Sequence, residues 1–125
     1  MPSPASSPSS SIPGYATPEG TRRYVARIGA KATAGHFREQ NGLQTSSIGI
    51  GTYLGEPDAA TDRGYTDAVI AAVENGVNLI DTAINYRFQR SERSVGAALR
   101  KLLASGFSRD EIILCTKAGF LTTDG

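Results

Sequence analysis

Two segments of the chain carry apolar residues at the spacing of an amphipathic α-helix. In both segments the apolar residues fall at offsets i, i+3, i+4, i+7 and i+8, so each would form one stripe along a helix. The two stripes are Tyr65, Ala68, Val69, Ala72 and Val73, and Val95, Ala98, Leu99, Leu102 and Leu103. Gly76 and Gly106 follow the stripes, where a left-handed C-cap would end each helix. We therefore predict two helices, with Thr66 on the polar side of the first.

Short apolar runs before, between and after these helices predict three β-strands. They cover residues 47–54, 77–82 and 112–116, and the third run is continuously apolar, as a parallel strand covered on both faces would be. Cys115 lies inside this third run, and we expect it to be a small core residue. Strands that alternate with amphipathic helices form right-handed crossovers and a parallel sheet, so the predicted class is α/β.

The N-terminal third of the chain gives weaker signals. Residues 1–14 are almost all Ser, Pro, Ala and Gly, and they cannot bury enough apolar surface to offset the entropy of ordering, so we predict a disordered tail. Residues 15–34 are an N-terminal segment of uncertain structure, in which residues 22–28 form either a short helix or an arm. Residues 35–125 form the predicted domain. We predict that it begins with a hairpin, because Asn41-Gly42 is the dipeptide that a type I′ turn prefers. His36 falls on its first strand, where we expect a packing or surface role.

Composition narrows the class of protein further. A chain of 125 residues with 39% hydrophobic content can build one modest domain. No stretch approaches the ~20 apolar residues that span a bilayer, and the start lacks the basic and apolar regions of a secretory signal. The net charge is +1 with both signs interspersed. We expect a cytoplasmic protein without a membrane or nucleic-acid partner, and the single cysteine excludes an internal disulfide or a cysteine-based metal site.

Two architectures are compatible with this order of elements, namely a doubly wound sheet and a (β/α)₈ barrel. In a doubly wound sheet we would expect a Gly-rich phosphate loop after the first strand. The segment Gly49-Ile-Gly51-Thr-Tyr-Leu54 approaches that pattern. Leu54 occupies the place of the third glycine, so the G-x-G-x-x-G spacing is off by one. The glycines then permit either the close approach of a ligand to the strand or tight packing near a barrel mouth.

Three side chains suggest chemistry at one edge of the predicted sheet. Asp81 ends the second strand, Tyr86 lies in the loop behind it, and Lys117 ends the third strand. The carboxyl ends of parallel strands meet at one edge, where such folds place their active sites. The ammonium of Lys117 would favour the phenolate form of Tyr86, and the carboxylate of Asp81 would keep the lysine charged and oriented. Tyrosine would then be a usable acid, although each of these residue types alone also has ordinary structural roles.

The joint pattern resembles the N-terminal part of the aldo-keto reductases. The matching residues are Asp81-Thr-Ala-Ile-Asn-Tyr86, Ser91-Glu92, Val95-Gly-Ala-Ala-Leu99 and Thr116-Lys117. The family pattern reads approximately D-T-A-x-x-Y-G-x-x-x-S-E-x-x-[VL]-G-x-A-L, followed by T-K, and the resemblance covers roughly residues 36–121. It implies the N-terminal portion of a (β/α)₈ TIM barrel whose preceding β-hairpin closes the bottom. Arg87 departs from the pattern, because glycine is usual at that position.

The resemblance implies an oxidoreductase that reduces a carbonyl of a small-molecule substrate to an alcohol with NADPH, or with NADH. Tyr86 would be the general acid, and Lys117 and Asp81 would tune it. Gly51, Thr52 and Asp81 would lie against the cofactor. No metal site is expected.

The family's histidine at the end of the fourth strand, and strands four to eight, have no counterpart before Gly125. We therefore expect residues 35–125 to be an N-terminal part of such a barrel, truncated after the third strand and inactive alone. The alternative is a non-enzymatic fragment that associates with a partner chain through its open sheet edge. Substrate identity and oligomeric state stay open.

Overall fold

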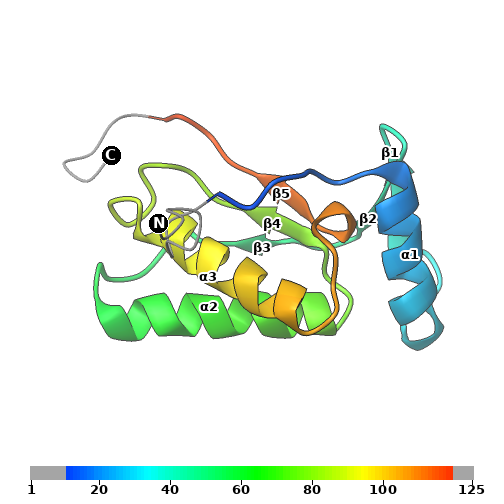
Figure 1. Cartoon of the computed structure of the whole chain (residues 1–125), viewed down its shortest axis with the longest axis horizontal. Coiled ribbons are helices and arrows are strands. Elements are labelled where there is room, and N and C mark those ends of the chain that lie inside the picture. Colours follow the sequence, from blue (N-terminus) through cyan, green and yellow to red (C-terminus); the bar gives the residue numbers. More distant parts are fainter. Residues whose placement is uncertain (1–10, 120–125) are drawn as a thin grey trace, which may run out of the picture.

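The computed structural model describes residues 11–119, so most of the predicted tail lies outside the described residues (Figure 1). Residues 11–14 form no helix or strand, and Ile12 packs partly against the core. The helices and strands follow in this order: α1 Pro18–Ile28, the 3₁₀ helix η2 Gly29–Lys31, β1 Phe37–Gln40, β2 Leu43–Ser46, β3 Ile50–Gly51, α2 Ala59–Glu74, β4 Leu79–Asp81, α3 Arg90–Ala104, the 3₁₀ helix η3 Arg109–Glu111 and β5 Ile113–Cys115.

The three predicted parallel strands form a sheet in the order β3–β4–β5. Ile50 pairs with Ile80 and Gly51 with Asp81, both in parallel register, and β4 pairs with β5 in the same direction. The strands are shorter than predicted because their apolar ends belong to the connections. The Val77 N–H, for example, donates to Ala72 O at 2.9 Å and so closes the end of α2 instead of pairing in the sheet. Helices α2 and α3 cover the same face of the sheet (Figure 1).

The structure confirms most of the predicted apolar stripe in α3 and corrects part of the one in α2. In α3, Val95, Ala98, Leu99 and Leu102 are buried as predicted, and they form the core with Ile80 and Ile112. In α2 the stripe is partly wrong. Val69 and Val73 are buried, whereas Ala68 is exposed and Thr66 is buried. Its buried face is turned toward α3, where the Thr66 hydroxyl donates to Ser94 O at 3.1 Å and so can be buried without loss of its hydrogen bond.

The turns and caps follow their predicted residues. The hairpin pairs Gln40 with Leu43, and the turn residues Asn41 and Gly42 have φ of 51° and 82°, as a type I′ turn requires. Gly76 and Gly106 have φ of 104° and 110° immediately after α2 and α3. These left-handed conformations cost glycine little, so both helices end where the sequence predicted.

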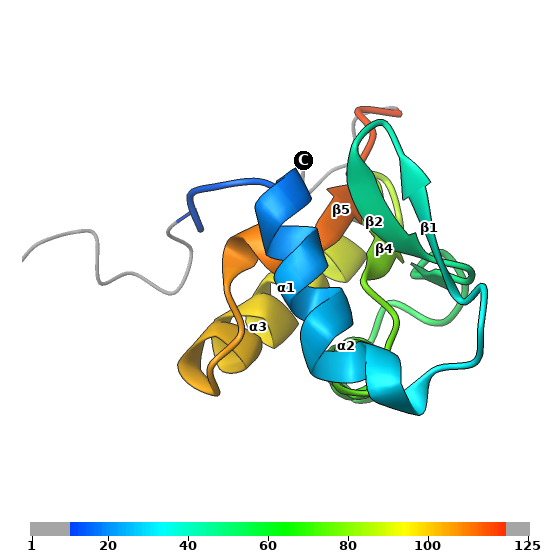
Figure 2. The same ribbon diagram turned by 90° about the vertical axis from the view of Figure 1, so that its right-hand side faces the viewer.

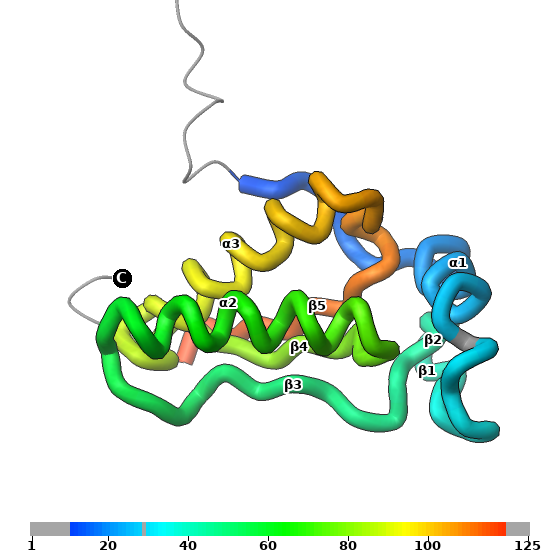
Figure 3. Tube along the Cα trace, turned by 90° about the horizontal axis from the view of Figure 1, so that it is seen from below, coloured from blue at the N-terminus to red at the C-terminus, as the bar shows by residue number. Residues whose placement is uncertain are grey.

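Helix α1 settles the uncertain arm in favour of the helical alternative. Thr17 caps it by accepting the Gly20 N–H at 2.9 Å, and Pro18 occupies the first helical position, where a missing N–H costs nothing. Tyr24 is fully buried and donates its hydroxyl to Val73 O, a carbonyl in the last turn of α2. Helix α1 and the hairpin lie at the amino end of the sheet, where each strand begins (Figures 2 and 3).

The predicted burial of Cys115 is wrong. It lies opposite Asp81 in the sheet and is exposed, because α2 and α3 cover one face only and no described element covers the other. His36 lies one residue before β1, and its ring contacts Gly76 O at 2.8 Å and Ser47 Oγ at 2.9 Å, which is a packing role.

Within residues 11–119, no helix is long and apolar enough to cross a bilayer. In the same part of the chain, no group of three His, Cys, Asp or Glu residues is arranged to hold a metal ion.

Candidate active site

The fold brings the three predicted catalytic side chains together at the carboxyl end of the sheet. Asp81 is the last residue of β4, Lys117 lies two residues beyond β5, and Tyr86 lies in the loop between β4 and α3. Because β4 and β5 are parallel and in register, their ends meet at the same edge. The ladder continues past the strands, since Thr82 N donates to Cys115 O at 2.8 Å and Ile84 N donates to Lys117 O at 3.0 Å.

Lys117 is the centre of this cluster. Its Nζ donates to Asp81 Oδ1 at 2.7 Å and to Thr82 O at 2.9 Å, and it lies 5.2 Å from the centroid of the Tyr86 ring. The hydrogen bond to Asp81 raises the pKa of Lys117, desolvation opposes that rise, and contact with Tyr86 adds to it. The side chains of Lys117 and Asp81 are 47% and 50% exposed, so the pair is open to solvent rather than buried. The cluster therefore holds a charged ammonium beside a phenol.

Tyr86 also contacts a residue that the sequence did not single out. The Tyr53 ring meets it edge-on, with 5.0 Å between ring centroids and 69° between the planes. Tyr53 follows Thr52 beyond the end of β3, so it reaches the site from a neighbouring strand. The only sequence signal for Tyr53 was its position just past a parallel strand, and that position alone does not identify a site residue because any residue type can occupy it.

Gly51 and Thr52 differ in what they offer a ligand. Gly51 lies opposite Asp81, and a Cβ built on it would meet nothing within 4 Å, so open space adjoins the strand there. Thr52 is fully buried. Its hydroxyl donates to Asp81 O at 2.9 Å, and its carbonyl accepts the Ser91 hydroxyl at 2.5 Å. Its side chain thus joins β3 to β4, and contact between Thr52 and a cofactor stays a prediction.

The loop that carries Tyr86 continues through three residues in the left-handed region. Arg87, Phe88 and Gln89 have φ of 51°, 56° and 68°, a conformation that costs roughly 1–2 kcal/mol for each non-glycine residue. The first of these residues, Arg87, occupies the position where glycine is usual in the family pattern. Something must hold this backbone in place, and the buried Arg87 side chain is the feature that glycine would lack.

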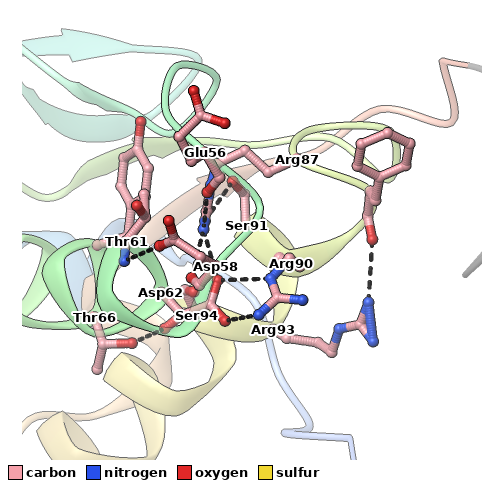
Figure 4. Close-up of polar contacts among 12 residues, drawn as sticks. Glu56, Asp58, Thr61, Asp62, Thr66, Arg87, Arg90, Ser91, Arg93 and Ser94 are labelled. Carbon is pink, nitrogen blue, oxygen red and sulfur yellow. Dashed lines mark hydrogen bonds and ion pairs between the residues drawn. The ribbon is translucent and has the colours of Figure 1, made fainter.

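Asp62 of α2 forms ion pairs with two arginines of this region. Arg87 Nη2 lies 2.6 Å from Asp62 Oδ1, and Arg90 Nη2 lies 2.9 Å from Asp62 Oδ2 (Figure 4). Desolvation raises the pKa of Asp62, but the hydrogen bonds from Arg90 and Arg87 outweigh it and hold the pKa below its ordinary value. The first turn of α2 and the first turn of α3 are joined by this carboxylate.

Comparison with known proteins identifies the family. The aldo/keto reductase family model matches residues 47–125, and the chain belongs to this family. The predicted hairpin precedes the matched region.

Two curated relatives illustrate the similarity. The chain is 38% identical over 79 residues to Aldo-keto reductase YhdN of Bacillus subtilis (strain 168), a match that covers 61% of this chain and 23% of that protein. It is also 38% identical over 80 residues to 2,5-diketo-D-gluconic acid reductase B of Corynebacterium sp. (strain SHS752001), covering 60% of this chain and 26% of that protein. The chain therefore spans about a quarter of the length of these relatives.

Proposed function

We propose that the chain contributes the acid–base site of a nicotinamide-dependent reductase that converts a carbonyl of a small-molecule substrate to an alcohol. In this proposal β3, β4 and β5 are the first three strands of a (β/α)₈ barrel. Membership of the family supports the proposal, and so does the parallel order of the strands. The observation that carries it is the position of Lys117 Nζ between Asp81 Oδ1 and the Tyr86 ring.

Each residue of the cluster has a distinct role in this mechanism. The Tyr86 phenol donates a proton to the carbonyl oxygen as that oxygen gains negative charge. The Lys117 ammonium stabilises the phenolate that remains, because an adjacent cation favours the charged form of an acid. Asp81 keeps Lys117 charged and directed at the ring through the 2.7 Å contact.

The residues present fit a nicotinamide at this edge of the sheet. Gly51 leaves open space opposite Asp81, which lets a flat group approach the strand closely. The nicotinamide supplies the hydride when bound, and we take NADPH as the first choice and NADH as the alternative. Gly51, Thr52 and Asp81 are the proposed cofactor-side residues.

The test is made in a polypeptide that continues through the rest of the family domain. Tyr86→Phe should lower kcat for an aldehyde by roughly 10²–10⁴, the usual contribution of general acid catalysis, while nicotinamide binding measured by fluorescence persists. Lys117→Met should lose a comparable amount. Tyr15→Phe is the matched control, because Tyr15 is 75% exposed and lies outside the site. Wild-type kcat in both Tyr86→Phe and Lys117→Met would refute the assignment.

A second candidate function rests on the open sheet. Among the described residues β3 and β5 each pair on one side only, so both edges have free hydrogen-bonding groups that a partner chain could join. This would make the chain a non-enzymatic fragment that binds a partner by strand addition. Light scattering after co-purification tests it. A stable complex that neither contains nor needs nicotinamide would favour it over the reductase.

A further inference from the structure

Arg87 ties the loop that carries Tyr86 to the loop between β3 and α2. Its side chain is 1% exposed. Nε and Nη2 both donate to Glu56 O, at 3.0 and 2.9 Å, and Nη2 also approaches Asp58 O at 3.4 Å. The ion pair with Asp62 adds a charged partner (Figure 4). A buried cation is tolerated only when its donors are satisfied, so these contacts fix the guanidinium in one place.

A second set of hydrogen bonds runs from Arg87 to the strand end that carries Asp81. Arg87 Nη1 contacts Ser91 Oγ at 3.5 Å, and Ser91 Oγ donates to Thr52 O at 2.5 Å. Thr52 Oγ1 in turn donates to Asp81 O at 2.9 Å. All three of these hydrogen bonds are buried or partly buried, so water does not compete freely with them. The guanidinium and the acidic end of the site therefore belong to one connected framework.

The same framework reaches the ring that contacts Tyr86. The Arg87 guanidinium carbon lies 5.0 Å from the centroid of the Tyr65 ring, and the Tyr65 hydroxyl donates to Leu54 O. Leu54 follows Tyr53, whose ring meets the Tyr86 ring edge-on. Arg87 thus contacts both segments whose tyrosine rings meet. It belongs to the segment that carries Tyr86, and it holds the segment that carries Tyr53 through Glu56 and Tyr65.

We infer that Arg87 is a positioning residue that holds the Tyr86 phenol against the Lys117 ammonium. The inference rests on the proposed function of Tyr86 and adds the residue that keeps it in place. Glycine, the usual residue in the family pattern, would accept the left-handed backbone at this position but would lack the hydrogen bonds that the guanidinium makes to the other loop. In this chain the arginine supplies the anchor directly beside the acid.

The decisive variant is Arg87→Gly, studied in a polypeptide that continues through the family domain. It removes the anchor without creating backbone strain, so kcat should fall about tenfold to a hundredfold through misplacement of the phenol, while KM for the nicotinamide changes by less than about threefold. Guanidinium chloride, added well below denaturing concentration, should restore part of kcat by filling the vacated site. Arg63→Ala is the control, because Arg63 is an exposed arginine of α2 with the same charge.

Wild-type kcat in Arg87→Gly would overturn the inference, and so would a loss that appears only in KM. A loss of kcat that guanidinium leaves unchanged in a folded variant would also count against it. If Arg87→Gly does not fold, Arg87→Lys decides, because lysine keeps the charge but cannot make the forked contact with Glu56 O. Full activity in Arg87→Lys would then overturn the inference.

A structural measurement separates this inference from the proposed function. In the 125-residue chain, the nuclear Overhauser effect between the Tyr53 and Tyr86 rings reports their contact without any turnover. It should weaken in Arg87→Gly and persist in Arg63→Ala, and persistence in both would refute the anchoring role. If Tyr86→Phe keeps wild-type kcat, the proposed function fails while this measurement still tests what Arg87 holds.

Discussion

Asp81 serves the site through two different atoms. Its carboxylate accepts the hydrogen bond from Lys117, whereas its backbone carbonyl accepts the Thr52 hydroxyl. A change of side chain therefore affects the orientation of Lys117 but leaves the link between β3 and β4 intact. The backbone contact explains how a half-exposed acid can still belong to a fixed framework.

We predict that Asp81→Asn lowers kcat by less than Tyr86→Phe does, about tenfold against 10²–10⁴, because the acid itself remains. The measurement is kcat with an aldehyde near neutral pH in the longer polypeptide. Asp67→Asn, an exposed change on α2, provides the control. A loss as large as that of Tyr86→Phe would mean that Asp81 does more than orient the lysine.

Tyr24 makes the stability of the chain sensitive to alkali. Burial raises the pKa of its phenol well above the ordinary 10.0. At a pH above 10.0 but below the raised pKa, the unfolded chain loses the proton of Tyr24 whereas the folded chain keeps it. The stabilisation from Tyr24 is therefore complete below about pH 10. Above that it falls by at most ~1.4 kcal/mol per pH unit.

We predict that urea unfolding shows this fall as the pH rises above about 10, and that Tyr24→Phe removes most of it. The variant should lose about 1 kcal/mol at neutral pH, because the Val73 carbonyl loses its donor. Tyr15→Phe should behave like the wild-type chain at every pH. An equal pH slope in wild type and Tyr24→Phe would show that other groups cause it.

At the scale of single residues, the sequence predicts the members of the cluster better than their surroundings. Asp81, Tyr86 and Lys117 could be placed because parallel strands end at one edge. Cys115 could not, since an apolar run does not reveal whether an element covers its second face. The role of Arg87 depends on a loop about thirty positions earlier in the chain, and no local pattern reports such a contact.

Among the elements, α3 was predictable and α1 was not, for a physical reason. Helix α3 carries a regular apolar stripe, whereas α1 is mostly polar and buries chiefly Tyr24 in the core. Short helices gain most of their stability from tertiary contacts, so the sequence of α1 alone left the choice open. The Thr17-Pro18 pair was its one clear local signal.

The packing of α1 against η3 gives a matched pair of glycine variants. A Cβ on Gly20 would lie 2.2 Å from Asp110 O, whereas one on Gly64 of α2 would meet nothing within 4 Å. Gly20→Ala should therefore destabilise the chain by about 1–3 kcal/mol. Gly64→Ala should stabilise it by about 0.5–1 kcal/mol through helix propensity. Urea unfolding measures both, and stabilisation by Gly20→Ala would mean that α1 does not dock as described.

For the molecule as a whole, the sheet has one covered face and one open face. The alternation of strands and helices predicted the α/β class and the parallel pairing, and both are confirmed. The continuously apolar third run wrongly suggested that β5 is covered on both faces, because the covering of its second face depends on elements other than the two helices. Exposure of Cys115 is the direct sign of this asymmetry.

We predict that a maleimide labels Cys115 readily in the 125-residue chain. In a longer polypeptide or a complex that covers the open face, labelling should be at least about tenfold slower, since access limits the reaction. Mass spectrometry of the labelled peptide measures the rate, and Cys115→Ser confirms the site. Slow labelling of the chain alone would show that something already covers this face.

The separation of α1 from the proposed catalytic edge has a consequence for how such a chain can change over evolutionary time. Helix α1, η3 and the hairpin stabilise the amino end of the sheet, and the loops with Tyr53 and Tyr86 lie at the other end (Figure 3). Substitutions that strengthen packing around Tyr24 would raise the stability reserve without altering the chemistry. In the proposed reductase, that reserve would let the loops accept destabilising substitutions that redirect substrate choice.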